Sequence, residues 1–257
     1  MLVSEVMAQQ TGVDRVVPYY RSFLAAFPTP AACAAAPVGE VVRAWRGLGY
    51  NRRAVSLHRA ATAVVERHAG ALPADLAALQ ALPGVGPYTA RAVLAFAFEQ
   101  DVGVVDTNVG RVLARWEGRP LRPAEAQARA DALVPTGRSW AWNQALMELG
   151  ATVCLRRAPH CGACPARSTC VWAAAGLSPP DPADGSAGVG TGQPRFEGSD
   201  RQGRGRLLEA LCRGPVPVAG VAAAAGWPDD PARADRVAAG MVADGLARRD
   251  GHVLRLP

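Results

Sequence analysis

Four cysteines follow one another closely in the second half of the chain, with the spacing C-x6-C-x2-C-x5-C. They are Cys154, Cys161, Cys164 and Cys170, directly behind a helical pattern at Trp142–Val153. Thiols so closely spaced, with no leader segment that would direct the chain to an oxidising compartment, favour one metal or iron–sulfur site over a disulfide framework. The chain is therefore expected to fold around a four-cysteine site.

The composition favours helices over strands. Hydrophobic residues make up 49% of the 257 residues, but much of this is alanine, and aromatic residues make up only 6%. Alanine is the strongest helix former, whereas strands prefer aromatic and β-branched residues. We expect an all-α fold, with enough chain for one large or two modest domains.

Apolar residues recur at spacings of three and four through most of the chain, the pattern of an amphipathic helix. Proline and glycine separate these stretches. The predicted helices are Leu2–Gln10, Val13–Phe27, Gly39–Trp45, Arg52–His68, Leu76–Ala81, Thr89–Phe98, Thr107–Trp116, Pro123–Leu133 and Trp142–Val153.

The composition changes after residue 176. Residues 177–197 are rich in Gly, Pro, Ser and Asp, which cannot bury a core and are typical of a linker. Residues 198–257 show three further helical patterns and a hairpin pattern turning at Asp250–Gly251. We expect a first domain at 1–176 and a small C-terminal domain at 198–257, either a winged-helix unit or a generic capping appendage.

The charged residues constrain the chemistry. The net charge of +6 and the pI near 9.4 suit a polyanionic partner but are also common on ordinary soluble proteins. All 28 basic residues are arginine, so no lysine side chain is present to form a Schiff base. No apolar run is long enough to span a membrane, and a cytoplasmic location is expected.

The segment Leu82–Thr89 reads L-P-G-V-G-P-Y-T and joins two predicted helices. Gly84 and Gly86 allow a tight turn, and Pro87 suits the first turn of the following helix. Backbone N–H groups at such a helix N-terminus can hold a phosphate without reading its base, although a plain helix–helix turn would look the same.

Five segments together resemble the endonuclease III superfamily of helix-hairpin-helix DNA glycosylases, and within it the adenine-specific, MutY-type branch. They are Leu2–Thr11, Gly47–Tyr50, Pro83–Thr89, Val105–Val109 and Trp142–Ala151. The resemblance extends from Met1 to about Ala174 and implies a six-helix barrel module plus an iron–sulfur module. It also implies that the four cysteines hold a [4Fe–4S] cluster, and that the partner is mispaired double-stranded DNA, bound by a monomer near the bacterial nucleoid.

The resemblance implies two catalytic carboxyl groups. Asp106 would stabilise the cationic sugar as the glycosidic bond breaks, although from its position alone it could be only a helix N-cap. Glu5, desolvated by its apolar neighbours, would protonate adenine at N7. Asn108 would support Asp106. Tyr88 stands where lyase-competent relatives carry their Schiff-base lysine, so hydrolysis without strand cleavage is expected.

Other residues are implied in base extrusion, because an enzyme that acts on a base in duplex DNA must flip it out of the stack. Those expected near the partner base are Gln10, Thr11, Leu48, Gly49 and Tyr50, and Gln144 is expected to line the adenine pocket. From the residues alone, core packing is the favoured role for Leu48 and Tyr50.

The chain departs from the family pattern at both ends. Family members usually have a further helix upstream of Glu5, and MutY-type members usually carry a Nudix-like domain where residues 198–257 stand. The preference for 8-oxoguanine over guanine opposite adenine therefore stays open. Two other functions stay open as well: a thymine or uracil mismatch glycosylase on the same scaffold, and a non-catalytic iron–sulfur DNA-binding protein.

Overall fold

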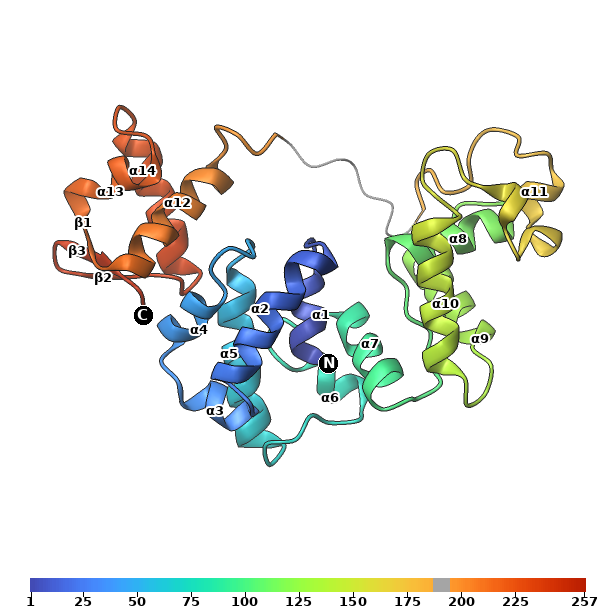
Figure 1. The fold of residues 1–257 in the computed structure, drawn as a ribbon, viewed down its shortest axis with the longest axis horizontal. Coiled ribbons are helices and arrows are strands. Elements are labelled where there is room, and N and C mark those ends of the chain that lie inside the picture. The colour runs from blue at the N-terminus through green and yellow to red at the C-terminus, as the bar shows by residue number, and fades with distance from the viewer. Residues whose placement is uncertain (187–194) are drawn as a thin grey trace. The chain divides into compact units, whose positions relative to one another are not determined.

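The structure is a computed structural model that describes residues 1–186 and 195–257. The described residues are mostly helical, which confirms the all-α prediction, and none of their helices is long and apolar enough to cross a membrane. The α-helices of the first 186 residues (Figure 1) are α1 (Leu2–Ala8), α2 (Val13–Ala26), α3 (Pro30–Ala35), α4 (Val38–Ala44), α5 (Arg52–Arg67), α6 (Leu76–Gln80), α7 (Pro87–Ala97), α8 (Thr107–Glu117), α9 (Pro123–Leu133), α10 (Ser139–Thr152) and α11 (Val171–Ala174).

The chain divides into two compact units, which are described separately. The α7–α11 unit comprises Met1, Ala74–Ala77 and Gly86–Gly192. The α1–α5 unit comprises the remaining residues, Leu2–Pro73, Ala78–Val85 and Gln193–Pro257.

Helix α5 is the centre of the α1–α5 unit. Because its apolar residues recur at helical spacing, one face is buried and packs against α1, α3 and α4. Trp45, which follows α4, is fully buried and meets Phe23 of α2 edge to face, with ring centroids 6.0 Å apart. This core therefore fixes helix α4, which precedes Trp45, and the 47–50 turn, which follows it.

The chain turns at Gly84 between α6 and α7, as the L-P-G-V-G motif predicts. Gly84 has a φ of 77°, and a Cβ on it would lie 2.5 Å from the Cβ of Ser56 on α5. Glycine is therefore required here on two grounds, the left-handed conformation and the close approach of α5. Helix α7 begins at Pro87 behind Gly86, an exposed residue with open space beside it.

Helix α8 is the centre of the α7–α11 unit. It packs against α9, α10 and α11. Its apolar face forms a core with residues of α9 and α10 and the segment between α8 and α9, among them Leu113, Leu121 and Leu146. Asp106 caps the N-terminus of α8, and Gly118 ends the helix in a left-handed conformation.

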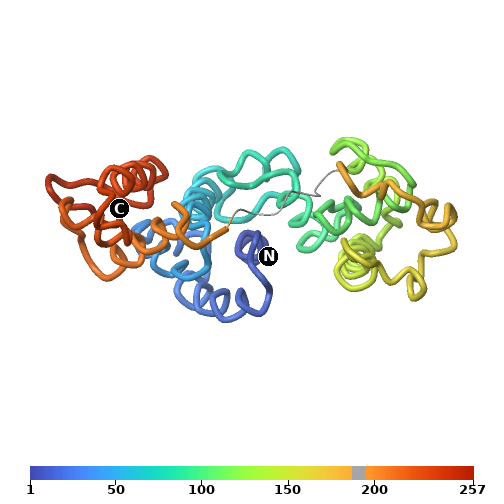
Figure 2. Tube along the Cα trace, turned by 90° about the horizontal axis from the view of Figure 1, so that it is seen from above, coloured from blue at the N-terminus to red at the C-terminus, as the bar shows by residue number. Residues whose placement is uncertain are grey.

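Residues 198–257 form three helices and a small sheet, grouped at the red end of the colour bar in Figures 1 and 2. The elements are α12 (Asp200–Arg213), β1 (Val216–Pro217), α13 (Val221–Ala225), α14 (Pro231–Ala243), β2 (Arg248–Asp250) and β3 (Val253–Arg255). The sheet is antiparallel with the order β1-β3-β2. Three helices with a strand between the first two and a closing hairpin is the order of a winged-helix unit.

The expected linker differs from the structure at its beginning. Within the predicted 177–197 segment, Ala183 and Ser186 are buried, and the Ser186 hydroxyl accepts a hydrogen bond from the Leu121 amide at 3.2 Å. Asp181 pairs with Arg115 of α8. Residues 181–186 are therefore a packed part of the α7–α11 unit. They supply hydrogen-bond partners for Arg115 and for the Leu121 amide, and composition does not reveal such pairings. Residues 187–194 of the expected linker lie outside the described residues.

Candidate active site

Asp106 is held by hydrogen bonds to both of its carboxyl oxygens. Its Oδ1 accepts from the Val109 amide at 2.7 Å, which is the N-cap bond, and its Oδ2 accepts from the Asn108 side-chain amide at 3.2 Å. These two accepted bonds, one to each oxygen, fix the orientation of the carboxyl group. Capping and catalysis are therefore compatible roles, because the cap fixes the direction of a half-buried acidic group.

Asn108 is itself oriented by Arg111. The Arg111 guanidinium donates to the Asn108 Oδ1 at 2.9 Å, to the Gly150 carbonyl at 2.5 Å and to the Cys154 carbonyl at 2.7 Å. The Asn108 amide group must therefore present its N–H side to Asp106. A continuous set of hydrogen bonds runs from Asp106 along α8 to the first cysteine of the four.

A buried asparagine fixes the segment before Asp106. Asn143 of α10 is 1% exposed; its Oδ1 accepts from the Val104 amide at 2.8 Å, and its Nδ2 donates to the Val102 carbonyl at 2.9 Å. The segment that leads into α8 is thus held to α10, because one side chain of α10 bonds to its backbone N–H and C=O groups.

The close packing of α8 on α10 gives the first prediction. A Cβ on Gly150 would lie 2.6 Å from the Cβ of Asn108, and nothing lies within 4 Å of a Cβ on Gly205 of α12. Gly150→Ala is expected to destabilise the protein by about 1–3 kcal/mol through overpacking. Gly205→Ala, the matched control at an exposed position of α12, should stabilise it by up to about 1 kcal/mol. Thermal denaturation of both variants measures this, and equal stability of the two would contradict the packing described.

The four cysteines line one small cavity in the α7–α11 unit. The cavity is bordered by Cys154, Cys161, Cys164 and Cys170, together with Arg115, Val153, Arg167, Trp172 and Ala173. The loop is shaped by two 3-10 turns, η1 (Cys161–Ala163) and η2 (Arg167–Thr169), and Cys170 is the N-cap of α11. Residues 154–170 thus bring all four thiols to one place, as their spacing predicts.

The donor set fits a cationic cluster. Burial, and then the neighbouring Cys154, Cys164 and Cys170, raise the pKa of Cys161, so four thiolates need a positive partner between them. Within residues 1–186 and 195–257, no three His, Cys, Asp or Glu side chains lie close enough together to hold a single metal ion. Ligands of a four-iron cluster bind different irons, so they stand further apart than the ligands of one zinc ion.

Arg115 joins this loop to α8. Its guanidinium, 3% exposed, pairs through two bonds of 3.0 and 2.6 Å with Asp181 and also donates to the Leu155 carbonyl at 2.7 Å and the Cys154 Sγ at 3.4 Å. Burial alone lowers the pKa of Arg115, but the hydrogen bonds to Asp181 and Cys154 raise it above its ordinary value. The group stays charged and is positioned to stabilise the Cys154 thiolate.

Tyr88 and Gln144 lie in the same unit as Asp106. Tyr88 is half-buried on α7 and packs against the apolar cluster that contains Val104. Gln144 is exposed on α10, next to the buried Asn143. The α7–α11 unit therefore contains Tyr88, Asp106, Asn108, Gln144 and the cysteine loop.

Glu5 lies in the α1–α5 unit, in the middle of α1. It is half-buried, and its neighbours Leu2, Val6 and Met7 are buried. The apolar residues beside Glu5 in the sequence are thus part of the core of this unit. The joint action of Glu5 and Asp106 stays a prediction.

The residues expected near the partner base form two adjoining turns in the α1–α5 unit. Tyr50 is 44% exposed and Gln10 is also exposed, as residues that contact DNA must be. Leu48 is only 4% exposed, so its side chain is part of the core in this structure. Its carbonyl accepts a hydrogen bond from the Thr11 hydroxyl at 3.4 Å, which links the two turns.

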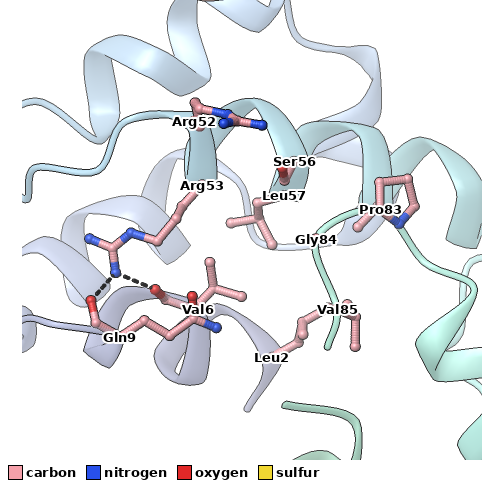
Figure 3. A pocket seen from close by; sticks show the side chains of 11 residues that line it. Leu2, Val6, Gln9, Arg52, Arg53, Ser56, Leu57, Pro83, Gly84 and Val85 are labelled. Carbon is pink, nitrogen blue, oxygen red and sulfur yellow. Dashed lines mark hydrogen bonds between the residues drawn. The ribbon is translucent and has the colours of Figure 1, made fainter. Parts of the chain in front are cut away.

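A cavity of about 210 Å³ lies beside these turns. Figure 3 shows its wall, made by α1 and Gln9 after it, the first half of α5 and the hairpin turn. Its residues are Leu2, Val6, Gln9, Arg52, Arg53, Ser56, Leu57, Ala60, Pro83, Gly84 and Val85. The hairpin residues Pro83–Val85 and helix α1, which carries Glu5, are therefore neighbours within one unit.

Sequence reasoning did not single out four polar residues that organise these sites: Arg53, Arg111, Arg115 and Asn143. Arg111 and Arg115 lie four residues apart among the buried apolar residues of α8, and Asn143 lies four residues after the buried Ser139 on α10. Polar residues at apolar helix positions are the signal that could have found them. Their partners lie up to 66 residues away in the sequence, so no local pattern marks them.

The chain is similar to known DNA repair proteins. The family model described as "HhH-GPD superfamily base excision DNA repair protein" matches residues 3–136. The adenine DNA glycosylase of Mycobacterium tuberculosis is 43% identical over 258 residues, which is 97% of this chain and 82% of the relative. That of Mycolicibacterium smegmatis is 42% identical over 97% of this chain and 84% of the relative. The human adenine DNA glycosylase is 44% identical, over 65% of this chain and 32% of its own length.

Solved structures give the same fold. A thermostable thymine-DNA glycosylase matches with a TM-score of 0.62 and 28% identity, over 68% of this chain and 83% of that one. An endonuclease III–DNA complex matches with a TM-score of 0.61 and 24% identity, over 68% and 84%. The chain belongs to the HhH-GPD superfamily of base-excision DNA repair proteins. It is a DNA glycosylase of the endonuclease III type that binds DNA.

Proposed function

We propose that the chain is a monofunctional adenine DNA glycosylase that hydrolyses the glycosidic bond of adenine opposite 8-oxoguanine or guanine. The observation that carries this proposal is the geometry of Asp106, whose two oxygens are held by Val109 and Asn108. A fixed carboxylate lowers the cost of an oxocarbenium-like transition state. The choice of adenine is supported by relatives that match nearly the whole chain and are named for that base.

Glu5 is the proposed general acid. Its place among buried apolar residues favours the neutral form of a carboxyl group, which can then protonate N7 of adenine. The protonated base is a better leaving group. One carboxyl group kept neutral and one kept ionised would divide the work, as in sugar hydrolases.

Water is the proposed nucleophile. Tyr88 has no amine, and the chain contains no lysine that could replace it. Gln10, Thr11, Gly49 and Tyr50 would brace the DNA once the base has left the stack, and Gln144 would contact the adenine. Leu48 would support this from the core.

The DNA backbone would be held at two places. The exposed Gly86 and the first turn of α7 offer N–H groups to a phosphate, and Arg156, Arg157 and Arg167 of the cysteine loop add positive charge. We propose a [4Fe–4S] cluster held by Cys154, Cys161, Cys164 and Cys170. When bound, it would crosslink this loop and fix its arginines; it would supply no step of the hydrolysis.

The lack of a lysine leads to a prediction on covalent trapping. When borohydride is added during turnover, the chain should give no stable protein–DNA adduct, because no imine forms at C1′. Denaturing gel electrophoresis of a labelled duplex measures this. An adduct formed in good yield would contradict the monofunctional assignment.

The test of the function is single-turnover base release from four duplexes that differ only in the mispair: A:8-oxoguanine, A:G, T:G and U:G. The proposal predicts release of adenine and no release of thymine or uracil. Release of thymine but not adenine would overturn it. That outcome is the second candidate, which the structural similarity to the thermostable thymine-DNA glycosylase favours.

The remaining assignments complete the proposal. The chain would act as a monomer in the bacterial cytoplasm, close to the nucleoid. Residues 198–257 would form a winged-helix unit in place of a Nudix-like one, within the compact unit that also holds α1–α5. Alignment with the mycobacterial relatives covers this region, since it takes in 97% of the chain.

A further inference from the structure

Arg53, the second residue of α5, makes more hydrogen bonds to other segments than its exposed neighbour Arg52 does. Its side chain extends from α5 toward the end of α1 (Figure 3). The acceptors are the carbonyls of Val6 (2.6 Å), Met7 (3.1 Å), Gln9 (2.5 Å), Leu48 (3.4 Å), Gly49 (3.1 Å) and Tyr50 (3.4 Å), and the Thr11 hydroxyl (3.3 Å). These acceptors come from two segments that are about forty residues apart.

One side of the guanidinium closes the end of α1. Nη1 donates to the carbonyls of Val6 and Met7, near the end of this seven-residue helix, and to the carbonyl of Gln9 just beyond it. Carbonyls at a helix end have no partner within the helix and need an outside donor. Arg53 thereby fixes the point at which the chain leaves α1 for Gln10 and Thr11.

The other side of the guanidinium closes the 47–50 turn. Nη2 donates to the Gly49 and Leu48 carbonyls and to the Thr11 hydroxyl. The rings of Trp45 and Tyr50 lie 5.4 and 5.5 Å from the guanidinium carbon, within the range of cation–π attraction. One planar cation thus touches both turns at once.

Both turns contain a backbone that needs such support. Gln10 has a φ of 58° and Tyr50 a φ of 47°. Residues other than glycine rarely adopt this left-handed region, and they keep it only where the surroundings determine it. Both strained residues are exposed, and the carbonyls of Gln9, Gly49 and Tyr50 at these turns accept hydrogen bonds from Arg53.

We propose that Arg53 is a positioning residue that couples the 9–11 turn to the 47–50 turn, and so fixes the relative placement of Gln10 and Tyr50 against the base opposite the excised one. This inference rests on the proposed function only in naming that base. Arginine is required, because its two amino groups point to different sides, whereas the lysine ammonium is a single point that can serve one turn or the other.

The test compares Arg53→Lys with Arg67→Lys, the same change at an exposed position of the same helix. The first readout is hydrogen exchange of the free protein. In Arg53→Lys, the amides of residues 9–11 and 47–50 should exchange faster by about tenfold, the effect of losing one charge-assisted hydrogen bond. Arg67→Lys should leave both turns unchanged.

The second readout is binding to duplexes that carry a stable abasic analogue opposite 8-oxoguanine or opposite cytosine. The ratio of the two affinities should fall about tenfold in Arg53→Lys and stay within twofold in Arg67→Lys. An unchanged ratio together with unchanged exchange would overturn the coupling. A fall in both affinities by the same factor would also overturn it, because that is the result of a merely structural role.

The test depends neither on the folding of Arg53→Lys nor on base excision. If Arg53→Lys does not fold, hydrogen exchange of Thr11→Val replaces it, because this change removes a hydroxyl that bonds to both Arg53 and Leu48. Faster exchange in both turns would support the coupling, and no change would overturn it. Neither readout needs base excision, so a chain that releases no adenine would sink the proposed function and leave this test intact.

Discussion

Adenine release is expected to be about a hundred to a thousand times slower in the Asp106→Asn protein than in the unchanged chain. The substitution removes the negative charge that would face the cationic sugar. It also places an N–H group opposite the Asn108 amide, which cannot turn over because Arg111 donates to its oxygen. Single-turnover base release from an A:8-oxoguanine duplex measures the effect.

The fold of this variant should survive, because asparagine is as good an N-cap as aspartate. Asp230→Asn is the matched control, since Asp230 caps α14 through a 3.0 Å bond to the Arg233 amide. It should release adenine within twofold of the unchanged rate. If Asp106→Asn released adenine as fast as this control, Asp106 would be a helix cap only, and its proposed part in bond cleavage would be wrong.

Arg115→Leu is expected to have the largest effect on stability. It leaves the Asp181 carboxylate, 24% exposed, without its cation, and it leaves the carbonyls of Leu155 and Arg156 without a donor. Removing one partner of a buried ion pair costs about 3–5 kcal/mol. For a chain of this size, 3 kcal/mol corresponds to an apparent Tm lower by roughly 6–12 °C. Iron content per chain should fall as well, because Cys154 loses the guanidinium beside its sulfur.

Arg119→Leu serves as the control for this experiment. Arg119 is 55% exposed and pairs with Glu125 on the surface at 3.0 Å. An exposed ion pair contributes at most about 1 kcal/mol, so the melting temperature and the iron content should hardly change. Equal effects of the two substitutions would show that the Arg115–Asp181 pair does not hold the cysteine loop to α8.

The features of this molecule that could be predicted from the sequence are those set by patterns over a few neighbouring residues. Helical periodicity located most helices to within a few residues, and the N-cap at Asp106 could be expected from its place before α8. Helix α3 was missed because P-A-A-C-A-A has no amphipathic pattern, although Thr29 caps it. Strand β1 was missed because it is two residues long and contains Pro217.

The unpredictable part depends on contacts between distant segments. No spacing indicates that Arg53 will meet both the end of α1 and the 47–50 turn, or that Asp181 will meet Arg115, because tertiary packing alone brings them together. The same holds for Leu48. Its apolar side chain suited either insertion into DNA or the core, and only the fold shows that it is buried.

The most direct test of the account is a crystal structure of the chain bound to an A:8-oxoguanine duplex whose adenosine has a glycosidic bond resistant to hydrolysis. The account predicts one extruded adenosine between the two acids. The Glu5 carboxyl group should lie about 3 Å from N7, and the Asp106 carboxylate should lie beside C1′ at a similar distance. An extruded base that contacts only one of these acids, or neither, would contradict it.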